Sequence, residues 1–336
     1  MEGLRFGVLL GLSGGVVSAL WVRAYLYWHP FGQYIRPEGL PSHHRKAGTP
    51  TMGGLALMQV FLAAWAMMAF WPVEVSWRGW LVFMSAAGAG AIGLLDDLLS
   101  GMRHRSEGLS PMGKLILQLV VATGIFLFLL FKGGNLVFAV PFSSLGVPVG
   151  AIPVPLLFLL VLLGFWGTTN GANLTDGLDG LAAGCGIVIL VGAVALTRAY
   201  PELTALSLLG AGLFAGFLWW NRYPARVFMG DVGSMFLGGL IFGIFTASGG
   251  ILLLPLFAGI FVVEALSVIA QVLSFKLFGV RVLKMSPLHH HLEEGEVPWR
   301  YLLRSPNWPE PVVVVRLWLL SAAFVALGIL VAMGGW

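Results

Sequence analysis

Long apolar runs separated by short polar links make up most of the chain. A helix needs about 20 apolar residues to cross a bilayer, and we expect about ten such helices, at residues 4–26, 52–71, 79–99, 113–131, 153–170, 179–198, 203–220, 232–249, 251–276 and 313–334. The runs lack the strict alternation of a membrane β-barrel, which is the other structure that can pair every backbone polar group inside a bilayer. The pattern therefore predicts an all-α integral membrane protein, folded as a single polytopic domain over residues 1–336.

The composition supports this fold class. Apolar residues make up 58% of the chain and charged residues only 10%, against roughly 25% charged in soluble domains. The first apolar run is too long for a signal peptide, its N-terminal end carries only Arg5 as a basic residue, and no small-residue cleavage motif follows, so we interpret it as a retained anchor. The one cysteine, Cys185, excludes an intramolecular disulfide.

The positive charges predict the orientation. Fifteen of the 19 lysines and arginines, among them Arg36, Arg45 and Arg105, fall on the links that follow the odd-numbered runs, and four fall on the other side. Because cytoplasmic links carry the excess of Lys and Arg, we expect both termini to be extracytoplasmic. The same charge can face anionic lipid or hold a phosphate-bearing ligand, and it gives no reason to expect nucleic acid.

All five aspartates fall on the predicted cytoplasmic side: Asp96, Asp97, Asp176, Asp179 and Asp231. Asp179 and Asp231 each precede an apolar run, so each could simply cap a helix N-terminus. Asp96 and Asp97 instead end a predicted helix, where the helix dipole disfavours negative charge. This adjacent pair indicates a bound cation, and Mg²⁺ is expected because it takes carboxylate oxygens together with water and phosphates.

Basic and histidine side chains complete a phosphate-binding hypothesis. Lys46 precedes GTPTMGG, whose N–H groups at a helix start could accept an anion, and Lys114, Arg222 and Arg226 lie on the same predicted side. GTPTMGG departs from the Walker pattern, so ATP hydrolysis is not indicated. His289, His290 and His291 lack the spacing of a helical zinc protease; two of them could bind zinc in an extended turn, but hydrogen bonding or partial positive charge toward a phosphate fits their neighbours better.

Five motifs together resemble a known family. GTPTMGG, GLLDDLL, NLTDGLDGLAAG, NRYPARVFMGDVGS and MSPLHHHLE occur in the same order, from about Gly32 to Glu293, as in the phospho-N-acetylmuramoyl-pentapeptide transferases, a branch of the polyprenyl-phosphate N-acetylhexosamine-1-phosphate transferases. The resemblance implies transfer of the phosphosugar of UDP-N-acetylmuramoyl-pentapeptide to undecaprenyl phosphate, giving lipid I and UMP. It also implies a Mg²⁺ cofactor and an active site at the cytoplasmic boundary of the bacterial inner membrane.

The resemblance also implies roles for individual residues. Asp231 is the expected main metal ligand, helped by Asp96 and Asp97, while Lys114 and the three histidines, His289, His290 and His291, are expected at the phosphates. The expected substrate-binding set is Lys46, Thr51, Asn170, Asn173, Asp176, Gly177, Leu178, Asp179, Asn221 and Phe228. In HHRKAGTPTMGG, either Arg45 or Lys46 could be the residue that contacts the phosphate.

Two competing functions stay open at this stage. A transferase of the same superfamily that uses UDP-N-acetylglucosamine is the nearer alternative, although TMGG and the uninterrupted histidines favour the muramoyl branch. A secondary transporter is the alternative from another class, but transporters place coupling charges near the bilayer midplane, often in inverted repeats, and no repeat is seen. A direct attack and a covalent aspartyl intermediate are both compatible with the sequence, as are a monomer and a homodimer.

Three further features carry weaker expectations. Gly212 with Gly216, and Gly239 with Gly243, are predicted to let helices pack closely. Glu264 lies in an apolar run, where an acid is either functional or part of a helix-to-helix hydrogen bond. The link at residues 132–152 alternates weakly and is expected to form a small hairpin without chemistry.

Overall fold

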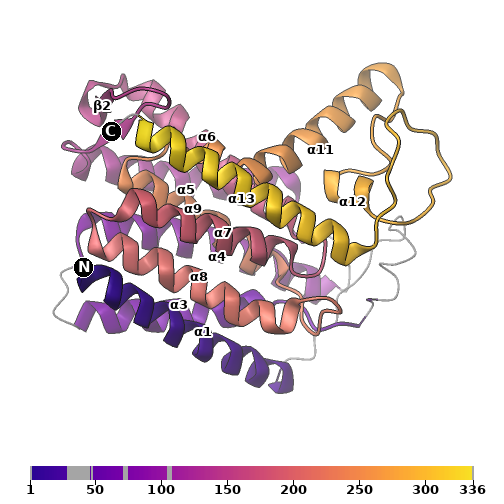
Figure 1. Cartoon of the computed structure of the whole chain (residues 1–336), viewed down its shortest axis with the longest axis horizontal. Helices are drawn as coiled ribbons and strands as arrows, with labels where there is room; N and C mark the ends of the chain where they lie inside the picture. Colours follow the sequence, from indigo (N-terminus) through magenta and orange to yellow (C-terminus); the bar gives the residue numbers. More distant parts are fainter. Residues whose placement is uncertain (1, 29–45, 47, 71–74, 104–107, 335–336) are drawn as a thin grey trace.

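The computed structural model describes residues 2–28, 46, 48–70, 75–103 and 108–334, and it is a bundle of long helices (Figure 1). Arg36, Arg45 and Arg105, three of the basic residues used to predict the orientation, lie outside the described residues. The helices of the bundle are α1 (Glu2–Trp28), α3 (Gly53–Phe70), α4 (Trp77–Arg103), α5 (Pro111–Lys132), α6 (Val154–Thr175), α7 (Leu181–Thr197), α8 (Pro201–Asn221), α9 (Gly230–Ser248), α10 (Leu254–Phe257), α11 (Gly259–Phe278) and α13 (Glu310–Gly334). The short helix α12 (Leu288–Leu292) lies in the link between α11 and α13.

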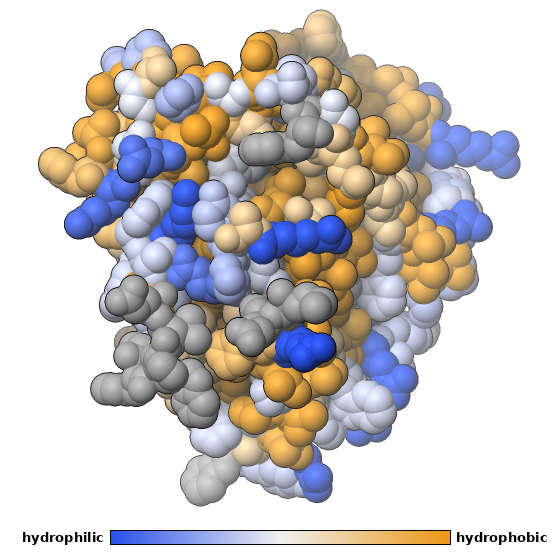
Figure 2. Space-filling model, turned by 60° about the vertical axis from the view of Figure 1, so that its left-hand side comes forward, coloured by the Kyte–Doolittle hydropathy of each residue, from blue (hydrophilic) through white to orange (hydrophobic). Residues whose placement is uncertain are grey.

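The helices are apolar enough for a membrane protein. Within the described residues, eight helices are long and apolar enough to cross a membrane, and α3 and α7 contribute two shorter apolar helices. Hydrophobic residues form most of the face seen in Figure 2, while hydrophilic residues gather in patches. The protein is therefore an all-α, multi-pass membrane protein. Both ends of the chain lie at one end of the bundle, and α12 lies at the other (Figure 1).

Glycines set the closest helix contacts, as predicted. A Cβ atom on Gly212 or Gly216 of α8 would collide with the backbone of α1, and one on Gly239 or Gly243 of α9 would meet the backbone of α4. Small residues allow two helix backbones to approach within the distance that larger side chains prevent. The prediction of close packing at both glycine pairs is confirmed.

Three predicted helix boundaries differ clearly from the structure, the first being that of the helix predicted at 153–170, which continues to Thr175. The helix predicted at 79–99 continues to Arg103, so Asp96 and Asp97 lie nearly two turns inside α4 and not at its C-terminal end. The run predicted as one helix over 251–276 is divided into α10 and α11 at Ala258. Gly249 ends α9 with a φ of 86°, and Pro255, which has no N–H, is placed at the start of α10, where a helix tolerates it.

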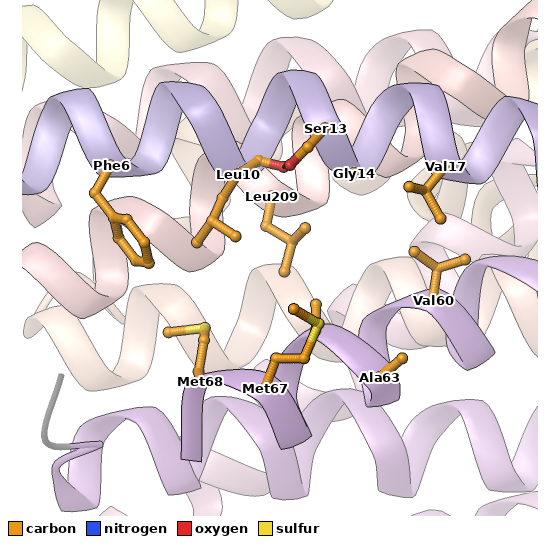
Figure 3. A pocket seen from close by; sticks show the side chains of 11 residues that line it. Phe6, Leu10, Ser13, Gly14, Val17, Val60, Ala63, Met67, Met68 and Leu209 are labelled. Carbon is orange, nitrogen blue, oxygen red and sulfur yellow. The ribbon is translucent and has the colours of Figure 1, made fainter. Parts of the chain in front are cut away.

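The surface features at the end of the bundle opposite to α12 hold no predicted site residue. The link after α5 forms an antiparallel hairpin of β1 (Val137–Ala139) and β2 (Gly146–Pro148), as expected. An apolar cleft of about 380 Å³ opens between α1 and α3, where Phe6 and Leu10 face Met67 and Met68 (Figure 3). The chemistry of the protein must therefore be sought at the end of the bundle where α12 lies.

Candidate active site

Three aspartates meet where α4 and α9 approach each other. Gly93 makes this approach possible, because a Cβ atom there would overlap the backbone of Asp231 at the start of α9. Asp96 and Asp97 follow Gly93 by about one turn of α4. Each of the three carboxylates, Asp96, Asp97 and Asp231, offers an oxygen within 4.8 Å of the others. We call this group the acidic centre.

Asp97 caps the N-terminus of α9. Its two carboxylate oxygens accept hydrogen bonds from the backbone N–H groups of Asp231, at 3.1 Å, and Val232, at 2.9 Å. Gly230, with a φ of 73°, turns the chain into α9 directly beside this carboxylate. Asp97 thus fills, from another helix, the capping role that was the alternative for Asp231. Negative charge at that position also complements the dipole of α9.

Asp231 makes no cap to its own helix and points toward basic and amide groups. Its Oδ2 lies 2.5 Å from Lys114 Nζ, and its Oδ1 accepts a hydrogen bond from Asn173 Nδ2 at 2.9 Å. Lys114 Nζ also lies 3.2 Å from Asp96 Oδ1. Predicted site residues from α4, α5 and α6 therefore gather around this carboxylate of α9.

The acidic centre fits a divalent cation. When ionised, the three carboxylates carry three negative charges, of which Lys114 neutralises one. Carboxylate oxygens are the donors that Mg²⁺ prefers, and the three oxygens are close enough together to serve one ion. Among the described residues, this is the one group of acidic, histidine or cysteine side chains with that spacing, so the described residues offer no such group for the zinc alternative at the histidines.

A second ionic cluster forms around Lys46. Its Nζ lies 2.6 Å from both Asp179 Oδ1 and Glu310 Oε1, and Glu310 Oε1 also accepts the backbone N–H of Asp179 at 2.8 Å. Burial works against the charge of Lys46, but Glu310 and Asp179 outweigh it and raise its pKa. Asp179 Oδ2 accepts the N–H of Ala225. The alternative that Asp179 simply caps the helix that follows it is wrong, because its oxygens accept from Lys46 and Ala225.

Asp176 lies between the two clusters. It follows α6 directly, and burial together with the charges of Asp231, Asp97 and Asp179 raises its pKa to about 8. An acid with this pKa holds its proton at neutral pH. The polar stretch between α6 and α7 thus links the acidic centre to the cluster around Lys46.

The three histidines point in different directions. His289 is fully buried against Gly177 and lies 3.2 Å from Glu264 of α11. His290 Nδ1 lies 3.2 Å from Glu293 Oε2. His291 Nδ1 accepts the backbone N–H of Lys284 at 3.0 Å, and burial, followed by the charge of Lys284, lowers its pKa. The expectation of partial positive charge is therefore wrong for His291, whereas His289 reaches the stretch after α6.

Several predicted substrate-binding groups have structural partners. Asn221 is buried and bonds to Gly180 and to the carbonyl of Val227, while Asn170 donates to Gln118 and Trp166. The N–H groups of Gly53 and Gly54 donate to the carbonyls of Phe228 and Met229, at 2.9 Å each. These two groups are therefore not free for an anion, contrary to the expectation for GTPTMGG.

The remaining predicted residues lie near the clusters without touching the acidic centre. Thr51 is half-buried, and its carbonyl accepts the Tyr25 hydroxyl. Phe228 is half-buried on the adjoining segment, where its N–H donates to Pro50. Leu178 is buried in the turn before α7. Arg222 and Arg226 are exposed and lie over Trp219 and Trp220 respectively.

Two acids that matter to the site were missed or left without a role. Glu310 is the first residue of α13, and an acid directly before an apolar run on the predicted cytoplasmic side was the available signal. Glu264 was noticed as an acid in an apolar run, but its partner His289 lies 25 residues away in the chain. Sequence spacing could not join the two.

Fold and site together define a polytopic membrane protein with an acidic, cation-accepting centre at one end of its bundle. The description "Glycosyl transferase family 4" belongs to the protein family that matches residues 79–249, which include the whole acidic centre. Relatives named phospho-N-acetylmuramoyl-pentapeptide-transferase match almost the whole chain. The protein of Heliobacterium modesticaldum is 38% identical over 99% of this chain and 99% of its own length.

Other relatives of the same name agree. The protein of Rubrobacter xylanophilus is 40% identical over 91% of this chain and 90% of its own length, and that of Mycobacterium leprae is 35% identical over 92% and 90%. The chain therefore belongs to the phospho-N-acetylmuramoyl-pentapeptide-transferase family.

Proposed function

We propose that this protein transfers phospho-N-acetylmuramoyl-pentapeptide from its UDP conjugate to undecaprenyl phosphate, giving lipid I and UMP. The observation that carries the proposal is the convergence of Asp96, Asp97, Asp231 and Lys114 at one end of a membrane bundle. Transfer of a phosphoryl group needs reactants to be positioned and negative charge to be neutralised more than it needs covalent chemistry. Acids that hold a cation, next to a lysine, meet both needs.

The setting of the site follows from the charges of the links. We propose ten membrane spans, with both termini outside and the acidic centre at the cytoplasmic boundary of the bacterial inner membrane. The donor is a polar nucleotide sugar, whereas the acceptor phosphate is attached to a membrane-embedded chain. A polar site at the end of an apolar bundle lets both substrates reach the same carboxylates.

Asp231, Asp96 and Asp97 would hold Mg²⁺. When bound, the ion would neutralise charge that develops on the diphosphate oxygens. Lys114 is placed to hold a phosphate oxygen, since its ammonium already lies among these acids. The lipid phosphate has a second pKa of about 6 and is largely ionised at neutral pH, so Asp96 or Asp97 need only orient it. The cluster of Lys46 and Asp179 is assigned to the nucleoside side of the donor.

The test is release of UMP by the purified protein in detergent. We expect release from UDP-N-acetylmuramoyl-pentapeptide that requires undecaprenyl phosphate and Mg²⁺. Release only from UDP-N-acetylglucosamine would overturn the donor assignment and keep the superfamily. If neither donor reacts with folded protein, and reconstituted vesicles show counterflow of a substrate, the transporter alternative replaces the proposal.

A further inference from the structure

Glu264 is a buried acid with an unusual environment. It lies in the apolar helix α11, its side chain has 0% exposure, and its Oε1 has no hydrogen-bond partner among the described residues. Burying a carboxylate costs several kcal/mol unless a partner compensates for it. Within the described part of the chain, the ion-pair partner of Glu264 is His289. An acid placed here at such a cost is expected to serve a function.

The contact fixes one edge of the His289 ring. Glu264 Oε2 lies 3.2 Å from His289 Nδ1 and accepts the backbone N–H of His289 at 3.4 Å. The carboxylate thus holds both the ring and the first turn of α12. Nδ1 lies at ion-pair distance from Oε2 without the geometry of a hydrogen bond. Because an ionised carboxylate only accepts hydrogen bonds, its charge favours a proton on the ring nitrogen that faces it.

The opposite edge of the ring meets the site. His289 Nε2 is buried, has no hydrogen-bond partner in the described residues, and lies so close to Gly177 that any side chain there would collide with it. Gly177 follows Asp176, whose carboxyl group is within reach of the charges of Asp231, Asp97 and Asp179. A path of contacts therefore leads from Glu264 through His289 to the stretch that separates the two ionic clusters.

We infer that Glu264 is a positioning residue, which holds His289 Nδ1 so that the Nε2 edge supports the Gly177 turn beside the acidic centre. The inference rests on the proposed function, because it assigns Glu264 a part in that transfer. The side-chain hydrogen bond and the ion pair of Glu264 both go to His289 and neither goes to the acidic centre, so its effect is expected to pass through His289. In metal sites, loss of the group that orients a ligating histidine costs 10- to 100-fold in metal affinity or activity, and we expect an effect of the same order here.

The experiment compares Glu264→Gln with wild type and with Glu202→Gln. Glu202 is a matched control, because it is also a buried glutamate but bonds to Ser76 at the opposite end of the bundle. We expect Glu264→Gln to lower kcat about 10- to 100-fold, with KM for the donor changed by less than about twofold. Glu264→Asp, which keeps the charge, should recover part of the loss, and Glu202→Gln should match wild type.

Two further readouts separate positioning from general damage to the fold. In ¹⁵N-histidine spectra, the His289 signal, assigned by its loss in His289→Gln, should show a smaller fraction of protonated Nδ1 in Glu264→Gln than in wild type and Glu264→Asp, because the neutral amide favours that proton less than a carboxylate does. In the His289→Gln background, Glu264→Gln should have little additional effect, because residues that act through one another are not additive.

The inference is overturned if Glu264→Gln keeps kcat within twofold of Glu202→Gln, if the His289 signal is unchanged, or if the loss is as large without His289. A wild-type protein that releases no UMP from either donor would contradict the proposed function instead. The spectra do not depend on turnover, so they still decide whether Glu264 holds His289.

Discussion

Lys114 and a divalent cation compete for the same oxygens, so removing the lysine should have opposite effects on metal binding and on turnover. Lys114 Nζ lies 2.5 Å from Asp231 Oδ2 and 3.2 Å from Asp96 Oδ1, and these three side chains are 12 to 26% exposed. Breaking a fully buried ion pair costs about 3–5 kcal/mol, and breaking a surface pair costs about 0–1 kcal/mol. For this partly buried pair we take a cost of about 2 kcal/mol. Lys114→Met should therefore lower the unfolding temperature without Mg²⁺ by about 4 °C.

The energy of the contacts between Lys114 and the two aspartates should also affect Mg²⁺ binding. In wild type the ammonium must give up these oxygens when Mg²⁺ binds, whereas in Lys114→Met they are free. About 2 kcal/mol corresponds to roughly 30-fold tighter Mg²⁺ binding, measured as the Mg²⁺ concentration that stabilises the protein against heat. Release of UMP should nevertheless fall at least tenfold, because a phosphate ligand is lost. Lys132→Met, an exposed lysine at the other end of α5, is the control. Weaker Mg²⁺ binding by Lys114→Met would refute the reasoning, since Lys114 would then shape the centre and not compete for it.

Three other changes test the two clusters. Asp231→Asn should lower UMP release at least 100-fold and abolish heat stabilisation by Mg²⁺; unchanged stabilisation would remove Asp231 from the metal site. Glu310→Gln should raise KM for the UDP donor several-fold with a smaller change in kcat, because Lys46 loses one of its two carboxylates; an unchanged KM would exclude this cluster from donor binding. Asp176, with a pKa raised to about 8, holds a proton that the unfolded chain gives up above about pH 4, so wild-type stability should fall as pH rises through that window. Without Mg²⁺, the unfolding temperature of Asp176→Asn relative to that of wild type should be higher at pH 8.5 than at pH 6. An equal difference at both pH values would contradict the raised pKa of Asp176.

The bundle was predictable because the bilayer constrains it strongly. A helix that spans a membrane needs a long apolar run, and nine of the ten predicted runs overlap one helix of the structure, while the run at 251–276 is divided between α10 and α11. Glycine pairs in such runs also predicted which helix surfaces pack closely, as at Gly212 and Gly239. The errors are at boundaries, where polarity misleads: Asp96 and Asp97 look like a helix end in the sequence, but α4 continues beyond them.

The acids of the site could be found from the sequence, but their partners could not. Charge and chain position identified Asp97 and Asp179 as members of a polar face. Which group each one serves depends on how distant helices meet, as when Asp97 caps α9 from α4. Glu310 pairs with Lys46, which lies 264 residues earlier in the chain. Short sequence patterns cannot predict pairs of residues that lie so far apart in the chain.

The partners change how ligand binding must occur. Each key acid already has a protein partner: Asp97 holds the start of α9, Asp231 holds Lys114 and Asn173, and Asp179 holds Lys46. Buried or half-buried charges need such partners if the folded state is to be stable. A cation or phosphate that enters the site therefore exchanges one set of contacts for another, and the net binding energy is the difference between the two. This exchange explains why substitutions of the basic partners, Lys114 above all, are expected to separate affinity for the ion from the rate of transfer.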